Sequence, residues 1–160
     1  MIRRHVTLAA LCGVLSLPVM AETVQCPDLA SAVRVGTCPS EDELKLTYVG
    51  YCSDNARIYR RDNEACLDYQ DYRKMKNIAL WESKDGEFNA YVSCDLPDAR
   101  VREARASSVS VAKQSGMTRL MCGYGEGVTF VRRSRAECRV VNESGNACSG
   151  ASCAASCDTP

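Results

Sequence analysis

The clearest pattern along the chain is a pair of short apolar segments separated by a polar turn. Residues 78–81 are all apolar, residues 88–94 carry an apolar side chain at every second position, and the dipeptide Asp85-Gly86 lies between the two segments. Asp-Gly between two such segments predicts a β-hairpin, because glycine accepts the positive φ that a tight turn requires. The alternate positions of the second segment, Phe88, Ala90, Val92 and Cys94, are therefore expected to share one face of a strand.

The same alternation continues through the second half of the chain. Turn-forming stretches at 113–116 and 125–127 separate further apolar positions at Val109, Val111, Leu120, Cys122, Tyr124, Val128 and Phe130. Alternation of period two between turns is typical of antiparallel strands. We therefore predict an antiparallel meander from about Ile78 to Val141, in which the segment from Ala99 to Ala106 fits either a helix or a connection.

The first half of the chain carries weaker and partly conflicting signals. Asp28 is placed to cap a short helix. Ser40 and Glu43 have the spacing of a helix capping box, whereas the following apolar positions alternate as they do in a strand. We favour the alternation, which predicts a strand over about Leu44–Cys52 that joins the meander. Residues 53–76 are polar and are expected to form a loop with one or two helical turns, pinned by Cys66.

These elements define the expected fold class. It is mainly β, possibly α+β, in the form of a small disulfide-rich antiparallel sandwich or partly closed barrel with one or two short helices. The domain is expected to span residues 22–141. Residues 142–160 are rich in cysteine, serine, glycine and alanine, and we expect them to form a tail that is too polar and too small to build a core but is stapled to the domain by disulfides.

The N-terminus has the three parts of a secretory leader. Basic residues Arg3 and Arg4 precede an apolar run from Val6 to Val19, and a small-residue cleavage motif ends at Ala21. The apolar run is shorter than the roughly 20 residues that a transmembrane helix needs. Residues 1–21 are therefore predicted to be a cleaved signal peptide, which places the mature chain in the bacterial periplasm or outside the cell, without a transmembrane anchor.

Ten cysteines remain once Cys12 is removed with the leader: Cys26, Cys38, Cys52, Cys66, Cys94, Cys122, Cys138, Cys148, Cys153 and Cys157. An even number of cysteines in a small exported chain predicts a disulfide framework, although the sequence does not determine the pairing. Metal binding by the four C-terminal thiols is the alternative, but their spacing differs from the C-x2-C pairs of zinc sites. We therefore predict disulfides and no metal or other cofactor.

The absence of histidine from the mature chain removes several catalytic mechanisms. His5 is the single histidine, and it belongs to the leader. A Ser-His-Asp triad, a Cys-His pair and a histidine-ligated zinc are thereby excluded. The sequence also lacks the G-x-S-x-G, H-E-x-x-H and Walker A motifs. The chain is therefore not expected to be an enzyme.

Two groups of neighbouring acidic residues leave one enzymatic alternative open. The groups are Glu41, Asp42 and Glu43, and Glu82, Asp85 and Glu87. Acidic neighbours of this kind are usually solvated charges at turns. The alternative is a glycan-acting enzyme that uses Glu82 or Asp85 with a distant second carboxylate, since glycosidases need two carboxylates about 5–10 Å apart.

The remaining function classes are binding and structural roles. Removal of the basic leader turns the balanced charge of the chain slightly negative, so nucleic acid is not an expected partner. The preferred hypothesis is an exported binding protein that inhibits or contacts another protein, and a structural subunit of an envelope assembly is a further alternative. Because interface centres favour aromatic residues, the candidate contact residues are Tyr59, Tyr69, Tyr72, Trp81 and Tyr91, with packing at the core as their other interpretation.

Overall fold

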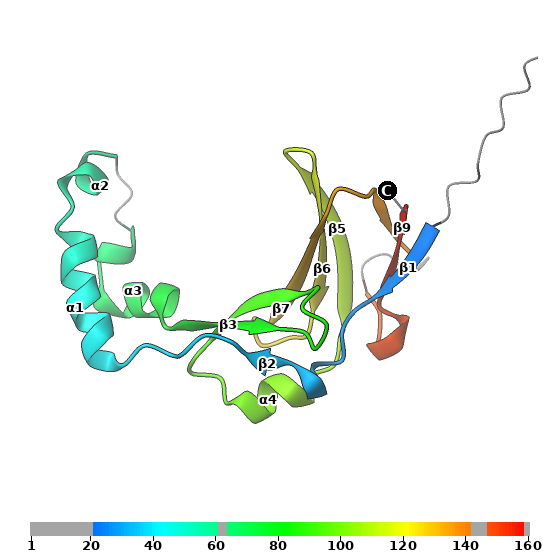
Figure 1. Ribbon diagram of the computed structural model, residues 1–160. Helices are drawn as coiled ribbons and strands as arrows, with labels where there is room; N and C mark the ends of the chain where they lie inside the picture. Colours follow the sequence, from blue (N-terminus) through cyan, green and yellow to red (C-terminus); the bar gives the residue numbers. More distant parts are fainter. Residues whose placement is uncertain (1–20, 61–63, 142–146, 159–160) are drawn as a thin grey trace, which may run out of the picture.

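Two open antiparallel sheets form the body of the protein (Figure 1). The computed structural model describes residues 21–60, 64–141 and 147–158. The six-stranded sheet has the order β2-β3-β4-β7-β6-β5, with strands β2 (Val33–Arg34), β3 (Ile78–Glu82), β4 (Asn89–Ser93), β5 (Ser108–Gln114), β6 (Met117–Gly123) and β7 (Thr129–Ser134). The three-stranded sheet has the order β1-β9-β8, with strands β1 (Ala21–Gln25), β8 (Cys138–Val140) and β9 (Ala154–Asp158).

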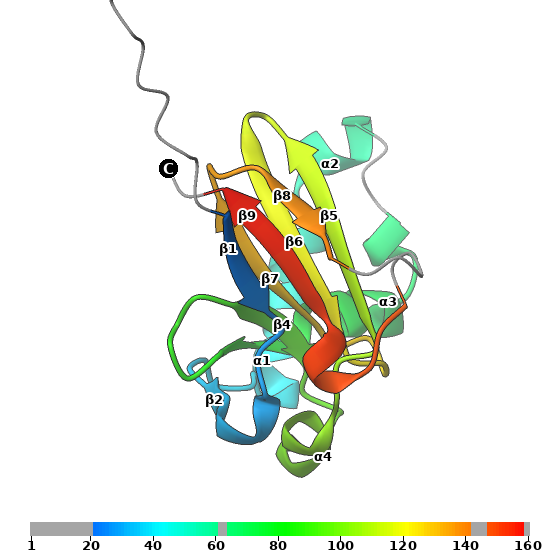
Figure 2. The same cartoon turned by 90° about the vertical axis from the view of Figure 1, so that its right-hand side faces the viewer.

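Most of the helical structure of the described residues is gathered in one insertion between β2 and β3. It contains α1 (Glu41–Cys52), α2 (Asn55–Arg60), the 3-10 turn η2 (Glu64–Cys66) and α3 (Tyr69–Lys76). Figures 1 and 2 show these helices on one side of the six-stranded sheet, opposite to β1 and β9. The other helical elements are η1 (Leu29–Ser31), α4 (Asp98–Glu103) and η3 (Gly150–Ser152). The expected fold class, a disulfide-rich β structure of sandwich type with short helices, is confirmed.

The hairpin of β3 and β4 is confirmed with the register expected from its turn. Ile78 pairs with Ser93 and Glu82 pairs with Asn89. Gly86 has a φ of 75°, which glycine adopts without steric cost. The predicted shared face is also correct, because Phe88, Ala90 and Val92 are all buried.

The strands after this hairpin do not form the simple meander that we predicted. β4 pairs with β7, and β5 lies at the far edge of the sheet. The connection through α4 carries the chain from β4 to that edge, and Val101 of α4 is fully buried. β8 then leaves this sheet and joins the smaller one. The alternation marked the strands correctly but carried no information about which strands are neighbours.

The predicted strand at Leu44–Cys52 is wrong, since these residues belong to helix α1. The backbone N–H of Glu43 donates to Ser40 Oγ at 3.2 Å, and the N–H of Ser40 donates to Glu43 Oε2 at 2.7 Å. This capping box satisfies two free N–H groups at the start of the helix. Acidic residues in the first turn also face the positive end of the helix dipole. The capping box therefore determined the structure of this segment. The short apolar alternation did not, and one of its members, Leu46, is exposed.

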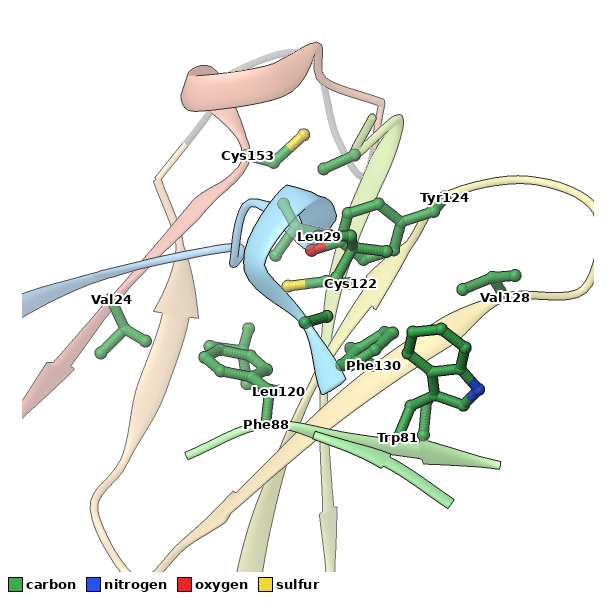
Figure 3. Packing of buried hydrophobic residues seen from close by; sticks show 14 of the residues in the cluster. Val24, Leu29, Trp81, Phe88, Leu120, Cys122, Tyr124, Val128, Phe130 and Cys153 are labelled. Atoms are coloured by element: carbon green, nitrogen blue, oxygen red, sulfur yellow. The ribbon is translucent and has the colours of Figure 1, made fainter. Parts of the chain in front are cut away.

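The main core lies between the two sheets (Figure 3). Phe130, Cys122 and Val109 of the larger sheet are fully buried, and they pack with Val24 of β1 and Leu29 of η1. Asp28 caps η1 by accepting a hydrogen bond from Ala30 N at 3.1 Å, as its position in the sequence suggested. Trp81 is buried in the same cluster, in agreement with the interpretation that it packs in the core.

All ten predicted cysteines form five disulfides. The pairs are Cys26–Cys122, Cys38–Cys94, Cys52–Cys66, Cys138–Cys157 and Cys148–Cys153. Cys26–Cys122 closes the longest loop, with a sequence separation of 96, and Cys122 is fully buried. These bonds are typical of proteins that work in an oxidising compartment. The predicted signal peptide lies almost entirely in residues 1–20, outside the described residues.

The C-terminal segment contributes to the core, contrary to expectation. β9 lies between β1 and β8 and forms backbone hydrogen bonds with both. Cys153 and Ala155 are fully buried, and Cys157 nearly so. Small side chains are sufficient here because the flanking strands satisfy the backbone and the opposite sheet supplies the large apolar groups. Within the described residues, no helix is long and apolar enough to cross a bilayer.

The unequal loops closed by the disulfides lead to a stability prediction. The double variant Cys26→Ala/Cys122→Ala is expected to lose about 4–5 kcal/mol of unfolding free energy, because it releases a long loop. Cys52→Ala/Cys66→Ala, with a separation of 14, is expected to lose about 3 kcal/mol. Urea unfolding of both variants measures the difference. Equal losses, or a larger loss for the short loop, would contradict the loop-closure argument.

Candidate functional site

Residues 41–60 and 64–76, which we call the helical lobe, form a part of the protein that projects from the sheets (Figure 1). Two disulfides hold it. Cys52–Cys66 joins the end of α1 to η2, and Cys38–Cys94 ties the chain just before α1 to the residue that follows β4. The helical lobe is thus crosslinked internally and attached at its base to the larger sheet.

Tyrosines fill the interior of the helical lobe. The ring of Tyr48 meets Tyr69 edge-on at a centroid distance of 5.4 Å and Tyr72 at 5.3 Å, and Tyr51 lies 5.4 Å from Tyr72. Such tilted contacts stabilise aromatic pairs beyond simple burial. The Tyr48 hydroxyl also donates to the carbonyl of Cys66 at 3.3 Å. Helices α1 and α3 are therefore held together by an aromatic cluster.

A polar network attaches the helical lobe to the end of β4. Arg73 donates from both terminal nitrogens to the two oxygens of Asp95, each at 2.8 Å, and from Nε to Glu41 at 3.2 Å. The Tyr69 hydroxyl donates to Glu41 at 2.7 Å, and the Asn77 side chain donates to Asp95 at 3.0 Å. A bidentate guanidinium–carboxylate pair fixes direction as well as distance, so this network orients α3 relative to the sheet.

The network shifts the titration of its members. The hydrogen bond from Tyr69 and the nearby Arg73 guanidinium lower the pKa of Glu41 below its ordinary value of 4.5. Hydrogen bonds from Arg73 lower the pKa of Asp95 below 3.8. Desolvation, followed by the hydrogen bond to Glu41, raises the pKa of Tyr69 from 10.0 to about 12. At neutral pH both carboxylates are ionised and the phenol is protonated, as the hydrogen bonds require.

An open groove of about 850 Å³ runs along α1. Its walls are formed by the segment before α1, by one face of α1 and by α3, and the lining residues are Thr37, Pro39, Glu43, Leu44, Thr47, Gly50, Tyr51, Asp54, Tyr72 and Lys76. The absence of a side chain at Gly50 keeps part of the groove open, since a Cβ there would meet no atom within 4 Å. The Lys76 ammonium group lies 5.3 Å from the centre of the Tyr51 ring, within cation–π range.

Three exposed apolar side chains of the helical lobe lie outside the residues that line this groove. Leu46 and Val49 of α1 are 75% and 63% exposed, and Leu67, between η2 and α3, is 77% exposed. Residues three apart on a helix are neighbours on its surface, so Leu46 and Val49 form one patch. Asp42 and Glu43 precede Leu46 by four and three residues, and the exposed Lys45 precedes Val49 by four, so this patch has a border with charges of both signs. We call Leu46, Val49 and this border the α1 patch.

The five predicted contact residues differ in their exposure to solvent. Tyr59, on α2, and Tyr91, on β4, are 87% and 68% exposed. Tyr69 is half-buried and bonded to Glu41. Tyr72 and Trp81 are buried, so their predicted role as contact residues is wrong. Tyr72 packs in the aromatic cluster, and Trp81 packs in the main core with the Arg102 guanidinium 5.3 Å from its ring.

The acidic residues of the β3–β4 turn have structural partners. Asp85 accepts hydrogen bonds from Ser83 Oγ at 2.5 Å and from Glu87 N at 3.0 Å, and these bonds lower its pKa. Glu87 pairs with Arg132 at 3.1 Å. A general acid in a glycosidase needs a raised pKa, which is the opposite direction. No described residues form a cluster of three or more potential metal ligands.

Comparisons of the chain with protein-family models, with curated proteins and with solved structures found no match.

Sequence reasoning missed Leu46 and Val49 as surface residues because it placed them in a strand. The capping box at Ser40 and Glu43 was the signal that identifies the helix. Once residues 41–52 are helical, Leu44, Tyr48 and Tyr51 share one face, and Leu46 and Val49 fall outside it.

The polar network leads to a pH prediction. The lowered pKa values of Glu41 and Asp95 contribute stability above their ordinary values of 4.5 and 3.8, and this contribution is lost as the pH falls below them. The raised pKa of Tyr69 contributes stability that is lost as the pH rises from 10.0 toward about 12. Chemical unfolding at a series of pH values should show both losses.

Tyr69→Phe provides the matched test of the alkaline loss. It should reduce that loss without abolishing it, because burial also raises the pKa of Tyr124. Tyr59→Phe is the control, since Tyr59 is exposed and lies outside the network. An alkaline profile that is identical for Tyr69→Phe and the unmodified chain would contradict the assignment.

Gly50→Ala tests the open wall of the groove. The new methyl group meets no atom within 4 Å, so the substitution is expected to stabilise the protein by about 0.5–1 kcal/mol through helix propensity. Gly36→Ala is the contrasting variant, because its Cβ would lie 3.1 Å from the backbone nitrogen of Leu80. Thermal unfolding should rank Gly50→Ala above the unmodified chain and Gly36→Ala below it.

Proposed function

We propose that this protein is an exported, non-enzymatic binding module that contacts another protein through the α1 patch of its helical lobe. The observation that carries the proposal is the exposure of Leu46 and Val49 on a helix whose other apolar face is already packed. A helix that presents apolar side chains on two sides has one side available for a partner.

The attachment of the helical lobe supports this role. Crosslinks at Cys52–Cys66 and Cys38–Cys94, together with the Arg73–Asp95 pair, restrict the movement of α1 before any partner binds. A surface that is already ordered loses less conformational entropy on association. The five disulfides fit the oxidising environment of the periplasm or the extracellular space.

The chemistry of the α1 patch indicates the kind of partner. Its apolar centre fits an apolar protrusion, and its border of Asp42, Glu43 and Lys45 fits surrounding charges of both signs. Complementary charges at the edge of an interface mainly accelerate association. The partner is therefore a protein whose contact surface has an apolar centre and charged side chains of both signs at its edge.

Site-specific photo-crosslinking in the cell that produces the protein tests the proposal. A photoreactive residue at position 46 or 49 should crosslink to one and the same protein, which mass spectrometry identifies. The control position is 35, because Val35 is 57% exposed but lies outside the helical lobe. A different set of products at 46 and 49, or the same products at 35, would rule out the α1 patch as the interface.

Affinity for the identified partner is the second measurement. Leu46→Ser/Val49→Ser is expected to weaken binding about tenfold to a hundredfold, as substitutions at the centre of an interface do. Val35→Ser should leave binding unchanged. Circular dichroism should show the same helix content in all variants, because the substituted side chains are exposed. Unchanged affinity in the double variant would refute the proposal.

A further inference from the structure

Two arginines lie side by side on the face of the six-stranded sheet that is turned away from the core. In β6 and β7 the core-facing positions are Leu120, Cys122 and Phe130, and the alternate positions point to the opposite face, which we call the outer face. Arg119 and Arg133 occupy directly paired positions of these strands on the outer face.

Such an arrangement is electrostatically unfavourable in isolation. Side chains that are directly opposite in an antiparallel pair have Cβ atoms roughly 4.5–5.5 Å apart, and like charges there repel. Neither arginine forms an ion pair with a carboxylate of the described residues. Arg119 donates to the Gln114 side chain at 3.4 Å, and Arg133 donates to the Asn89 side chain at 3.4 Å, so both acceptors are neutral amides.

One donor of this pair has no partner at all. The Nε–H group of Arg119 is buried from solvent and forms no hydrogen bond within the structure. A buried donor without an acceptor is costly, and for a charged group the cost is higher. The strands of the six-stranded sheet place a single carboxylate, Glu82, on the outer face, and its strand β3 is separated from β6 by both β4 and β7.

We propose that Arg119 and Arg133 form a binding site for a doubly charged oxyanion, the phosphate monoester group. A phosphate monoester carries a charge of about −1.5 to −2 at neutral pH, which matches the two uncompensated guanidinium groups. Its oxygens accept hydrogen bonds from the planar fork of an arginine, and the terminal nitrogens of Arg119 and Arg133 are the donors available to it. A single carboxylate would neutralise one of the two charges.

This site is independent of the α1 patch, because it lies on the strands rather than on α1. Figures 1 and 2 show the helical lobe on the same side of the sheet as the outer face, so a phosphorylated ligand would reach the site from that side. The ligand is either a soluble phosphate monoester or the headgroup of a lipid such as phosphatidic acid. The chemistry of recognition is the same in both cases.

Titration of the isotope-labelled full chain with inorganic phosphate tests the site. The Nε–H signals of Arg119 and Arg133 should shift in a saturable manner, whereas the signal of Arg139 on β8 should not. Arg133→Gln and Arg119→Gln should each weaken the apparent affinity about tenfold. Arg139→Gln is the control, because it removes the same charge from the other sheet.

Two results would overturn the proposal. The first is the absence of a saturable shift at either arginine, and the second is an equal loss of affinity in Arg139→Gln, which would indicate only general electrostatic attraction. Arg133 is exposed, so its variant remains informative even where Arg119→Gln fails to fold.

Co-sedimentation with vesicles separates the two sources of the phosphate group. Binding to vesicles of phosphatidylcholine with phosphatidic acid, but not to phosphatidylcholine alone, and its loss in Arg133→Gln, would support the site with a lipid ligand. Saturable binding of inorganic phosphate without vesicle binding would support it with a soluble ligand. Vesicle binding that persists in both arginine variants would contradict the site as the lipid contact.

Discussion

The covalent attachment of the helical lobe is the constraint on which the functional architecture depends. The helical lobe buries few residues of its own among those described, chiefly Leu44 and Tyr72. Apolar burial on this scale does not stabilise an independent unit. The bonds Cys52–Cys66 and Cys38–Cys94 compensate for the small core, and the Arg73–Asp95 pair sets the direction in which α3 leaves the sheet. Exposure of Leu46 and Val49 is possible because the helix does not need them for its own packing.

The two proposed binding surfaces differ in the physical effect that would drive association. At the α1 patch the main contribution is the burial of apolar area, with charge acting at the border. At the Arg119–Arg133 pair the main contribution is the compensation of two neighbouring positive charges. The helical lobe and the outer face of the sheet lie on the same side of the molecule, opposite to the three-stranded sheet (Figure 2). A partner that carries a phosphate group is therefore compatible with contact at both surfaces, and a partner without one is compatible with the first.

Local patterns predicted the local structure well and the long-range structure poorly. The hairpin at Asp85-Gly86 could be predicted from residues that are close in sequence. The participation of all ten cysteines in disulfides could be predicted from their even number. The position of β5 at the edge of the sheet depends on packing across α4, which no short pattern encodes. Helix α1 was missed because three alternating apolar residues were weighed more heavily than a capping box, although the box involves two hydrogen bonds. Tyr72 and Trp81 show the same limit, since an aromatic residue fits a core and an interface equally well until its neighbours are known.

Disulfide mapping of the mature protein is the most direct test of this account. Proteolysis under non-reducing conditions, followed by mass spectrometry, should identify peptides linked through Cys38–Cys94 and Cys52–Cys66, with no free thiol among the ten cysteines. A free thiol at any of these four positions, or a bond that joins Cys52 or Cys66 to a strand of either sheet, would contradict the account, because the helical lobe would then be held in a different way.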